Sequence, residues 1–209
     1  MYLLLIIANV LVSLRGFKVP SFFNDYSFHP TSVLKRGEYY RMVTSGFLHV
    51  DPGHLIFNMI TLFFFGSLLE RLVGIPKFLV IYFASMVAGD LLSLWLHRNQ
   101  SAYRAVGASG AVCGIIFATI ALYPGIRIFI MFIPIGIPGW IYAVFFIWYS
   151  SFGIQRQMGN IGHDAHLGGA IAGLLLASFF FPGVVFAHYL VTMGLLALSI
   201  AALVLALTR

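Results

Sequence analysis

Four polar residues of this chain have the types and spacing that acyl-transfer chemistry needs. Ser109, in the stretch "VGASGAVCG", offers a hydroxyl nucleophile, and His166, in "HDAHLGG", is a candidate general base. His54 and Asn58, in "HLIFN", are four residues apart and share one helical face. Both can donate hydrogen bonds to a developing oxyanion, as can the unpaired backbone N–H groups at the start of the Ser109 helix. These residues predict a serine-type site.

Glycine pairs in the segments of the serine and the histidine support the same site. Gly110 and Gly114 follow the serine, and Gly169 and Gly173 follow the histidine. Small residues at this spacing let two membrane helices approach closely. A Ser–His hydrogen bond needs such an approach, because its heavy atoms lie about 2.6–3.2 Å apart. We therefore expect the two segments to pack directly against each other.

Each polar residue also has a structural explanation when it is taken alone. Ser109 between glycines is typical of a packing contact, and His166 is typical of an interhelical hydrogen-bond donor. His54 and Asn58 can hydrogen-bond to the long loop before them. Only the combination of the four residues favours catalysis over these structural roles.

A metal site is a weaker alternative for the histidines. The candidate ligands are His49, His54, His163, Asp164 and His166. The chain lacks the H-E-x-x-H pattern, and a metal site would give no role to Ser109. His163 and Asp164 are better explained as the polar first turn of a helix, where a carboxylate is favourable.

No third catalytic acid is evident in the sequence. Asp164 is two residues from His166, so the two side chains point to different helix faces. Asp90, in "VAGDLLSLW", is better explained by protonation or by a hydrogen bond to a neighbouring helix than by a role in orienting His166. We therefore expect a Ser109–His166 dyad.

The composition determines what kind of elements must position these residues. The chain is 61% hydrophobic and only 9% charged over 209 residues, which is too little polar surface for a soluble domain of this size. Its few charges give a net charge of +6 and suit contacts with lipid headgroups. No basic run is interleaved with aromatic residues, so nucleic acid is not an expected partner. The composition predicts an all-α integral membrane bundle.

Breaks at glycine, proline and charge divide the chain into seven expected spans within one domain, residues 1–209. A segment over about 15–53, which alternates aromatic and basic residues, is expected to lie in the membrane interface. Residues 152–162 are expected to form a mobile cap, because their glycines and polar residues pack poorly. The seven spans cover residues 1–14, 54–73, 76–97, 107–123, 137–151, 163–181 and 184–207.

The number of spans places the candidate residues together. The second, fourth and sixth spans all begin on the side of the membrane that holds residues 15–53, which we call side A. His54 and Asn58, Ser109, and His166 lie in the opening turns of these three spans, roughly 0 to 8 Å inside them. Polar groups at this depth are costly unless they face the bundle interior, so they are functional candidates.

The three motifs resemble those of the rhomboid family of intramembrane serine proteases. The similarity lies in "GASG", "HLIFN" and "AHLGG", and it extends over about residues 38–175, including Tyr40–Arg41 and His49. The resemblance implies that Ser109 is the nucleophile and His166 the base, with His54, Asn58 and the Ser109 N–H as the oxyanion hole. It implies transmembrane protein substrates, cleaved near the membrane boundary, and neither a metal nor a cofactor. It also divides the chain into a six-helix core, about residues 1–182, and a seventh helix over 184–207.

Two features depart from the family pattern. Many members carry a tyrosine one turn after the serine that packs on the catalytic histidine, and this chain has Cys113 there. Side A holds nine of the twelve Lys and Arg residues, which by charge alone predicts a cytoplasmic side A. The family resemblance implies an extracytoplasmic active site in a cell or inner membrane, and we give it more weight, because the 15–53 segment is partly membrane-embedded in the family.

Two other classes of function remain as alternatives. One is a catalytically silent relative that binds transmembrane helices, although such relatives typically lack the serine or the histidine. The other is a small transporter or channel, which would need polar groups at both membrane faces. The polar groups of this chain gather on side A, which argues against conduction.

Overall fold

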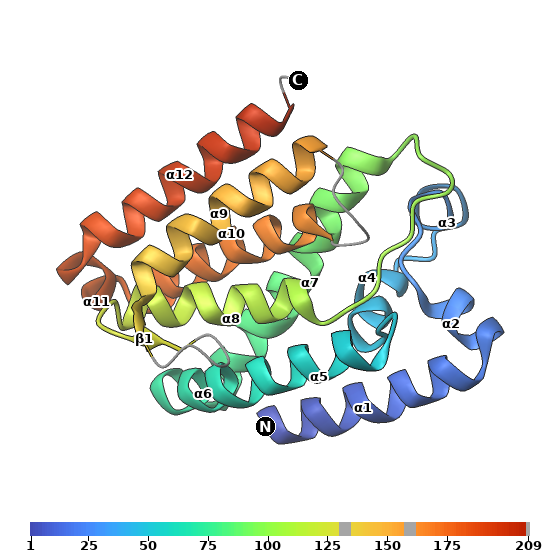
Figure 1. Cartoon of the computed structure of the whole chain (residues 1–209), viewed down its shortest axis with the longest axis horizontal. Coiled ribbons are helices and arrows are strands. Elements are labelled where there is room, and N and C mark those ends of the chain that lie inside the picture. The colour runs from blue at the N-terminus through green and yellow to red at the C-terminus, as the bar shows by residue number, and fades with distance from the viewer. Residues whose placement is uncertain (130–134, 157–161, 208–209) are drawn as a thin grey trace.

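The protein is an all-α helix bundle, as the composition predicts. The computed structural model describes residues 1–129, 135–156 and 162–207, and within these ranges the only strands are a short antiparallel pair, β1 (Arg127–Ile128) and β2 (Ile137–Pro138). The long helices run mainly along one direction of the molecule (Figure 1). Among the described residues, three helical stretches are long and apolar enough to cross a membrane: Pro52–Val73, Ile75–His97 and Tyr189–Ala206.

The interfacial segment after the first span is folded into short helices that the sequence analysis did not resolve. Prolines at the first helical position begin two of them, since proline lacks the N–H that would be unpaired there. Gly37, at φ 69°, ends the helix that begins at Pro30. The first span is α1 (Tyr2–Lys18), and the helices after it are α2 (Pro20–Tyr26), α3 (Pro30–Arg36), α4 (Arg41–Thr44) and the 3₁₀ turn η1 (Ser45–Phe47).

The second span is continuous, although it contains one turn of π-helix. Asp51 caps its start by accepting a hydrogen bond from the His54 N–H at 2.8 Å. Gly74, at φ 77°, separates it from the third span. The elements are α5 (Pro52–Thr61), η2 (Leu62–Gly66), α6 (Ser67–Val73) and α7 (Ile75–His97).

The remaining predicted spans also form helices, with three differences. The fourth begins two residues later than expected, because Gly107, at φ 131°, is not helical. The fifth begins at Gly139, because residues 137 and 138 form β2, and it continues through residues 152–156 of the expected cap. Residues 157–161 of that cap lie outside the described residues. The last expected span is two helices. The elements are α8 (Ser109–Leu122), α9 (Gly139–Arg156), α10 (His163–Phe180), α11 (Pro182–Ala187) and α12 (Tyr189–Leu207).

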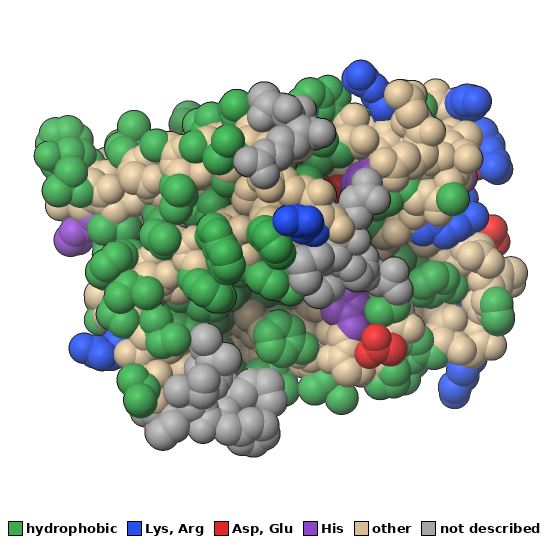
Figure 2. All heavy atoms as spheres, turned by 45° about the horizontal axis from the view of Figure 1, so that its top comes forward, with side chains coloured by type: hydrophobic (Ala, Val, Ile, Leu, Met, Phe, Trp, Pro, Cys, Tyr) green, Lys and Arg blue, Asp and Glu red, His purple; other side chains and the backbone are tan. Residues whose placement is uncertain are grey.

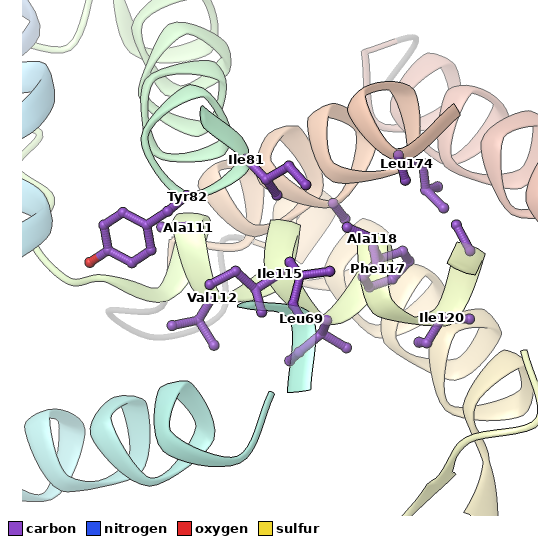
Figure 3. Close-up of a cluster of buried hydrophobic side chains, with 14 of the residues drawn as sticks. Leu69, Ile81, Tyr82, Ala111, Val112, Ile115, Phe117, Ala118, Ile120 and Leu174 are labelled. Carbon is purple, nitrogen blue, oxygen red and sulfur yellow. The ribbon is translucent and has the colours of Figure 1, made fainter. Parts of the chain in front are cut away.

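Helix α8 forms the centre of the bundle. It packs directly against α7 and α10, and nearly all of its residues are buried. Figure 3 shows its apolar side chains between those of α6, α7 and α10. The labelled residues are Leu69, Ile81, Tyr82, Ala111, Val112, Ile115, Phe117, Ala118, Ile120 and Leu174. Because lipid is as apolar as these side chains, close van der Waals packing stabilises this arrangement.

The candidate residues lie at one end of the bundle. Helices α5, α8 and α10 all have their starting ends directed to the right in Figure 1, toward the part of the molecule that holds α2, α3 and α4, as the number of spans predicts. Most Lys and Arg side chains on the face drawn in Figure 2 also lie at that end, whereas hydrophobic side chains cover most of the rest. Side A is therefore the polar, basic end of the molecule.

Candidate active site

Ser109 is the first residue of α8 and is reached by a sharply bent backbone. Gly107 has a positive φ of 131°, a conformation that L side chains rarely adopt. A Cβ atom on Gly107 would lie only 2.7 Å from Cε1 of His54 and 3.6 Å from Oγ of Ser109. The His54 ring and the Ser109 hydroxyl therefore border the same small space. The backbone N–H of Ser109, in the first turn of a helix, has no intrahelical acceptor and is available as a donor.

The backbone before Ser109 is attached to the interfacial segment at three points. Phe28 and Ala105 exchange two backbone hydrogen bonds, at 3.0 and 3.2 Å. The Gly107 N–H donates to the Ser45 carbonyl at 3.0 Å. The Ala108 N–H donates to Nε2 of His49 at 3.4 Å. These bonds tie the backbone before Ser109 to Phe28, Ser45 and His49, which lie far earlier in the sequence.

Helices α8 and α10 approach as closely as the glycine pairs predict. A Cβ atom on Gly169 would overlap the carbonyl of Gly110, and one on Gly173 would overlap the carbonyl of Gly114. At the start of α10, the carbonyl oxygen of Ala165 lies 3.3 Å from where a Gly110 Cβ would be. The residues next to Ser109 and His166 are thus in contact across the two helices.

His166 is half-buried in the first turn of α10, and two rings pack near it. The Phe146 ring lies 6.0 Å away between centroids, and the His163 ring 6.2 Å away. Within the described residues, the side chains of Ser109 and His166 do not share a hydrogen bond. Such catalytic bonds are often long before a substrate binds.

Asn58 and His54 lie on one face of α5, as their spacing predicts. Asn58 is buried and donates one amide hydrogen to the His54 carbonyl at 2.9 Å. The second amide hydrogen of Asn58 is not used in that bond. The structure therefore places His54 beside Ser109, and it places Asn58 one turn further into the bundle.

His49 has a structural position that sequence reasoning missed. It is fully buried, and its ring packs edge-on against His54 at 4.9 Å. The Ser13 hydroxyl of α1 donates to the Phe47 carbonyl at 2.9 Å, so the 2.9 Å contact between Ser13 Oγ and His49 Nδ1 makes Nδ1 the donor. Nε2 is then free to accept the Ala108 N–H. Burial, with the nearby His54 as a smaller cause, lowers the pKa of His49 to about 3, so the ring is neutral.

The two candidate acids, Asp164 and Asp90, make their hydrogen bonds to residues other than Ser109 and His166. Oδ2 of Asp164 lies 3.1 Å from Nε2 of His97 and accepts a hydrogen bond from the Tyr103 hydroxyl at 3.3 Å. Asp90 accepts a hydrogen bond from Ser45 at 3.0 Å. These contacts join the side-A ends of α7 and α10 to the loops, which agrees with the structural roles expected for both acids.

The metal alternative gains no geometric support. In the part of the chain that the structure describes, no three His, Cys, Asp or Glu side chains gather as a set of metal ligands.

A comparison with protein families identifies the family of this chain. The model of the rhomboid domain matches residues 36–183, well over half of the chain. The chain belongs to the rhomboid family. This confirms the family that the three motifs predict, and with it the all-α, multi-pass integral membrane architecture.

Curated relatives of this rhomboid protein come from plants, yeast and bacteria. It is 34% identical to RHOMBOID-like protein 12, mitochondrial, of Arabidopsis thaliana over 79% of the chain and 54% of the relative. It is 31% identical to Rhomboid protein 1, mitochondrial, of Saccharomyces cerevisiae over 64% of the chain and 40% of the relative. It is 32% identical to Rhomboid protease GluP of Bacillus subtilis over 70% of the chain and 27% of the relative. The chain thus spans about half or less of the length of these three relatives.

Proposed function

We propose that this rhomboid protein is an intramembrane serine endopeptidase that uses a Ser109–His166 dyad. The observation that carries the proposal is the glycine-mediated contact of α8 with α10, which sets the turn of Ser109 against the turn of His166. The His54 ring beside Ser109 supports it further. One relative, GluP of Bacillus subtilis, is named a rhomboid protease.

The roles follow from the chemistry of each group. Ser109 Oγ attacks a peptide carbonyl while His166 takes its proton, and His166 later gives that proton to the leaving amine. His54, Asn58 and the Ser109 N–H donate hydrogen bonds to the oxyanion as it forms. Water then attacks the acyl-enzyme, with His166 again as the base. Neither a metal nor a cofactor enters this sequence of steps.

The substrates we propose are transmembrane proteins, cut near the membrane boundary. The candidate residues lie in the opening turns of three membrane helices, so a substrate helix would meet them close to its own end. A peptide bond inside a helix is shielded, and local unwinding must precede attack. Glycine or proline near the cleaved bond should help, since they cost about 1 and about 3 kcal/mol in a helix.

Labelling with a fluorophosphonate probe tests the proposal. The full chain, reconstituted in lipid, should become covalently labelled, whereas Ser109→Ala and His166→Ala should fold and remain unlabelled. Circular dichroism and thermal unfolding of each variant provide the control for folding. Labelling of the Ser109→Ala protein at the wild-type rate would contradict the assignment.

A second candidate function is binding of transmembrane helices without cleavage. The observation in its favour is that, within the described residues, the side chains of Ser109 and His166 share no hydrogen bond. A folded wild-type protein that never labels, even with probe in large excess, would favour this second function over proteolysis.

We further propose that the chain is a single domain embedded in the lipid bilayer of a cell or inner membrane. Side A of this domain faces away from the cytoplasm. The basic side chains at this end would contact lipid headgroups. Two relatives are named as mitochondrial proteins, so an inner mitochondrial membrane is one setting that fits.

A further inference from the structure

One face of α9 carries a row of aromatic rings that points at the candidate site. Tyr142, Phe146 and Tyr149 are spaced by four and three residues, so they share a face. Tyr149 packs edge-on against His163 at 5.1 Å, and Phe146 lies 6.0 Å from His166 with an angle of 33° between the rings. Both histidines in the first turn of α10 therefore meet a ring from α9.

Helix α8 does not supply such a ring in this chain. Its close approach to α10 requires glycine at positions 110 and 114, and the residues between them are also modest in size. Cys113, one turn after Ser109, is buried and carries no ring that could pack on His166. With Cys113 at this position, the His166 ring is left to be held from another helix.

The Phe146 ring is itself held in place. It stacks on Tyr142 at 5.9 Å and meets Phe117 of α8 edge-on at 5.6 Å. On the neighbouring face of α9, Ala143 and Ile147 are fully buried, which fixes the rotation of the helix. Because its surroundings fix it, Phe146 can act as a rigid wall for the imidazole.

We propose that Phe146 is a positioning residue that holds the His166 imidazole in the orientation that accepts the Ser109 proton. The inference rests on the proposed function, because it gives His166 the role of base. It makes α9 the third helix of the active site, although α9 contributes no reacting group. Loss of the ring would let the imidazole rotate away from Ser109, and small misplacements of this kind can cost up to about a hundredfold in rate.

The kinetics of fluorophosphonate labelling test this role in the full, lipid-reconstituted chain. Phe146→Ala should lower the maximal labelling rate about ten- to a hundredfold, while the half-saturating probe concentration stays the same. Phe146→Tyr, which keeps the ring, should restore most of the rate. The matched control is Phe145→Ala on the same helix, where the ring is 63% exposed and packs on Trp148, and it should label within about twofold of wild type.

Two outcomes would overturn the inference while leaving the proposed function intact. One is wild-type labelling of Phe146→Ala. The other is an equal loss of rate in Phe145→Ala and Phe146→Ala, which would show a general effect on α9. If the wild-type protein does not label at all, the proposed function fails, and a measurement that does not need activity decides the packing.

That measurement is an NMR spectrum of the protein with isotope-labelled histidine rings. The His166 signal is assigned by its disappearance in His166→Gln. Removal of the Phe146 ring should shift the His166 Hε1 resonance, because an aromatic ring within about 6 Å perturbs its neighbour, whereas Phe145→Ala should leave the resonance in place. An unchanged His166 resonance in Phe146→Ala would show that the two rings do not pack in the membrane.

Discussion

At the scale of single residues, the proposed function gives Asn58 two tasks that share one amide group. One amide hydrogen already bonds to the His54 carbonyl, and the other would meet the oxyanion. Asn58→Ala should therefore label slowly but measurably, because removal of one oxyanion donor typically costs about 10²–10³ in rate.

Thr61→Ala is the matched control for Asn58→Ala. Thr61 makes the same kind of bond one turn later, from its hydroxyl to the Phe57 carbonyl at 2.8 Å, away from the site. It should label at the wild-type rate. A comparable loss in both variants would mean that α5, rather than an oxyanion donor, was disturbed.

His49 should make folding stability depend on pH. Its pKa is about 3 in the folded protein, against 6.5 for an unperturbed histidine, so the unfolded chain binds the proton more readily. The neutral ring contributes its full stability above pH 6.5, and this contribution is lost as the pH falls from 6.5 towards 3. Below about pH 3, both states carry the proton and the loss ends.

Thermal unfolding at several pH values measures this effect. The His49→Gln variant, whose amide does not titrate, should be less stable than wild type at pH 7.5, and its melting temperature should fall less steeply between pH 6.5 and pH 4. Parallel curves for the two proteins would contradict the assignment of a buried, neutral His49.

At the scale of elements, the contact between α8 and α10 is the most sensitive to side-chain size. Gly169→Ala would place a Cβ atom in the Gly110 carbonyl, and backbone at this depth cannot move aside easily. We expect the variant to unfold at a lower temperature and to lose labelling, because separation of the helices moves His166 from Ser109.

Gly194→Ala, in α12, is the control for this substitution. Apart from its chain neighbours and its own helix backbone, nothing lies within 4 Å of the position of its Cβ, so the variant should fold and label normally. Alanine should also favour the helix by up to about 1 kcal/mol. Tolerance of both substitutions would show that the two helices are further apart in the membrane.

The sequence could locate the helices but not all of their ends and contacts. Apolar runs between glycines and prolines gave the seven spans, whereas the true start of α8 depends on the positive φ of Gly107, which hydropathy does not report. Ser13 and Phe146 were missed because each reaches the site from a distant part of the chain. Such contacts leave no periodic pattern in the sequence. The four site residues, by contrast, belong to short motifs at the starts of helices.

At the scale of the whole molecule, the orientation in the membrane is open to a direct test. Asn99→Cys places a thiol in an exposed loop on side A, and Gly125→Cys places one at the opposite end. The native Cys113 is only 5% exposed and should stay unreactive. In bacterial cells that express the protein, an impermeant maleimide should label Asn99→Cys from outside and Gly125→Cys only after the cells are opened. The reverse pattern would place side A in the cytoplasm, as the excess of basic residues would by itself predict.

On side A, the end of α7 extends further than the start of α8, and this difference has a consequence for water. Gly89 and Gly110 both face the carbonyl of Ala165, so they lie at the same level, yet α7 continues to His97, about 12 Å further. Ser109 therefore lies deeper than the last two turns of α7. Under the proposed function, the water that hydrolyses the acyl-enzyme would have to reach Ser109 past these two turns. It would then act below the level of the lipid headgroups, enclosed by the helices that pack around α8.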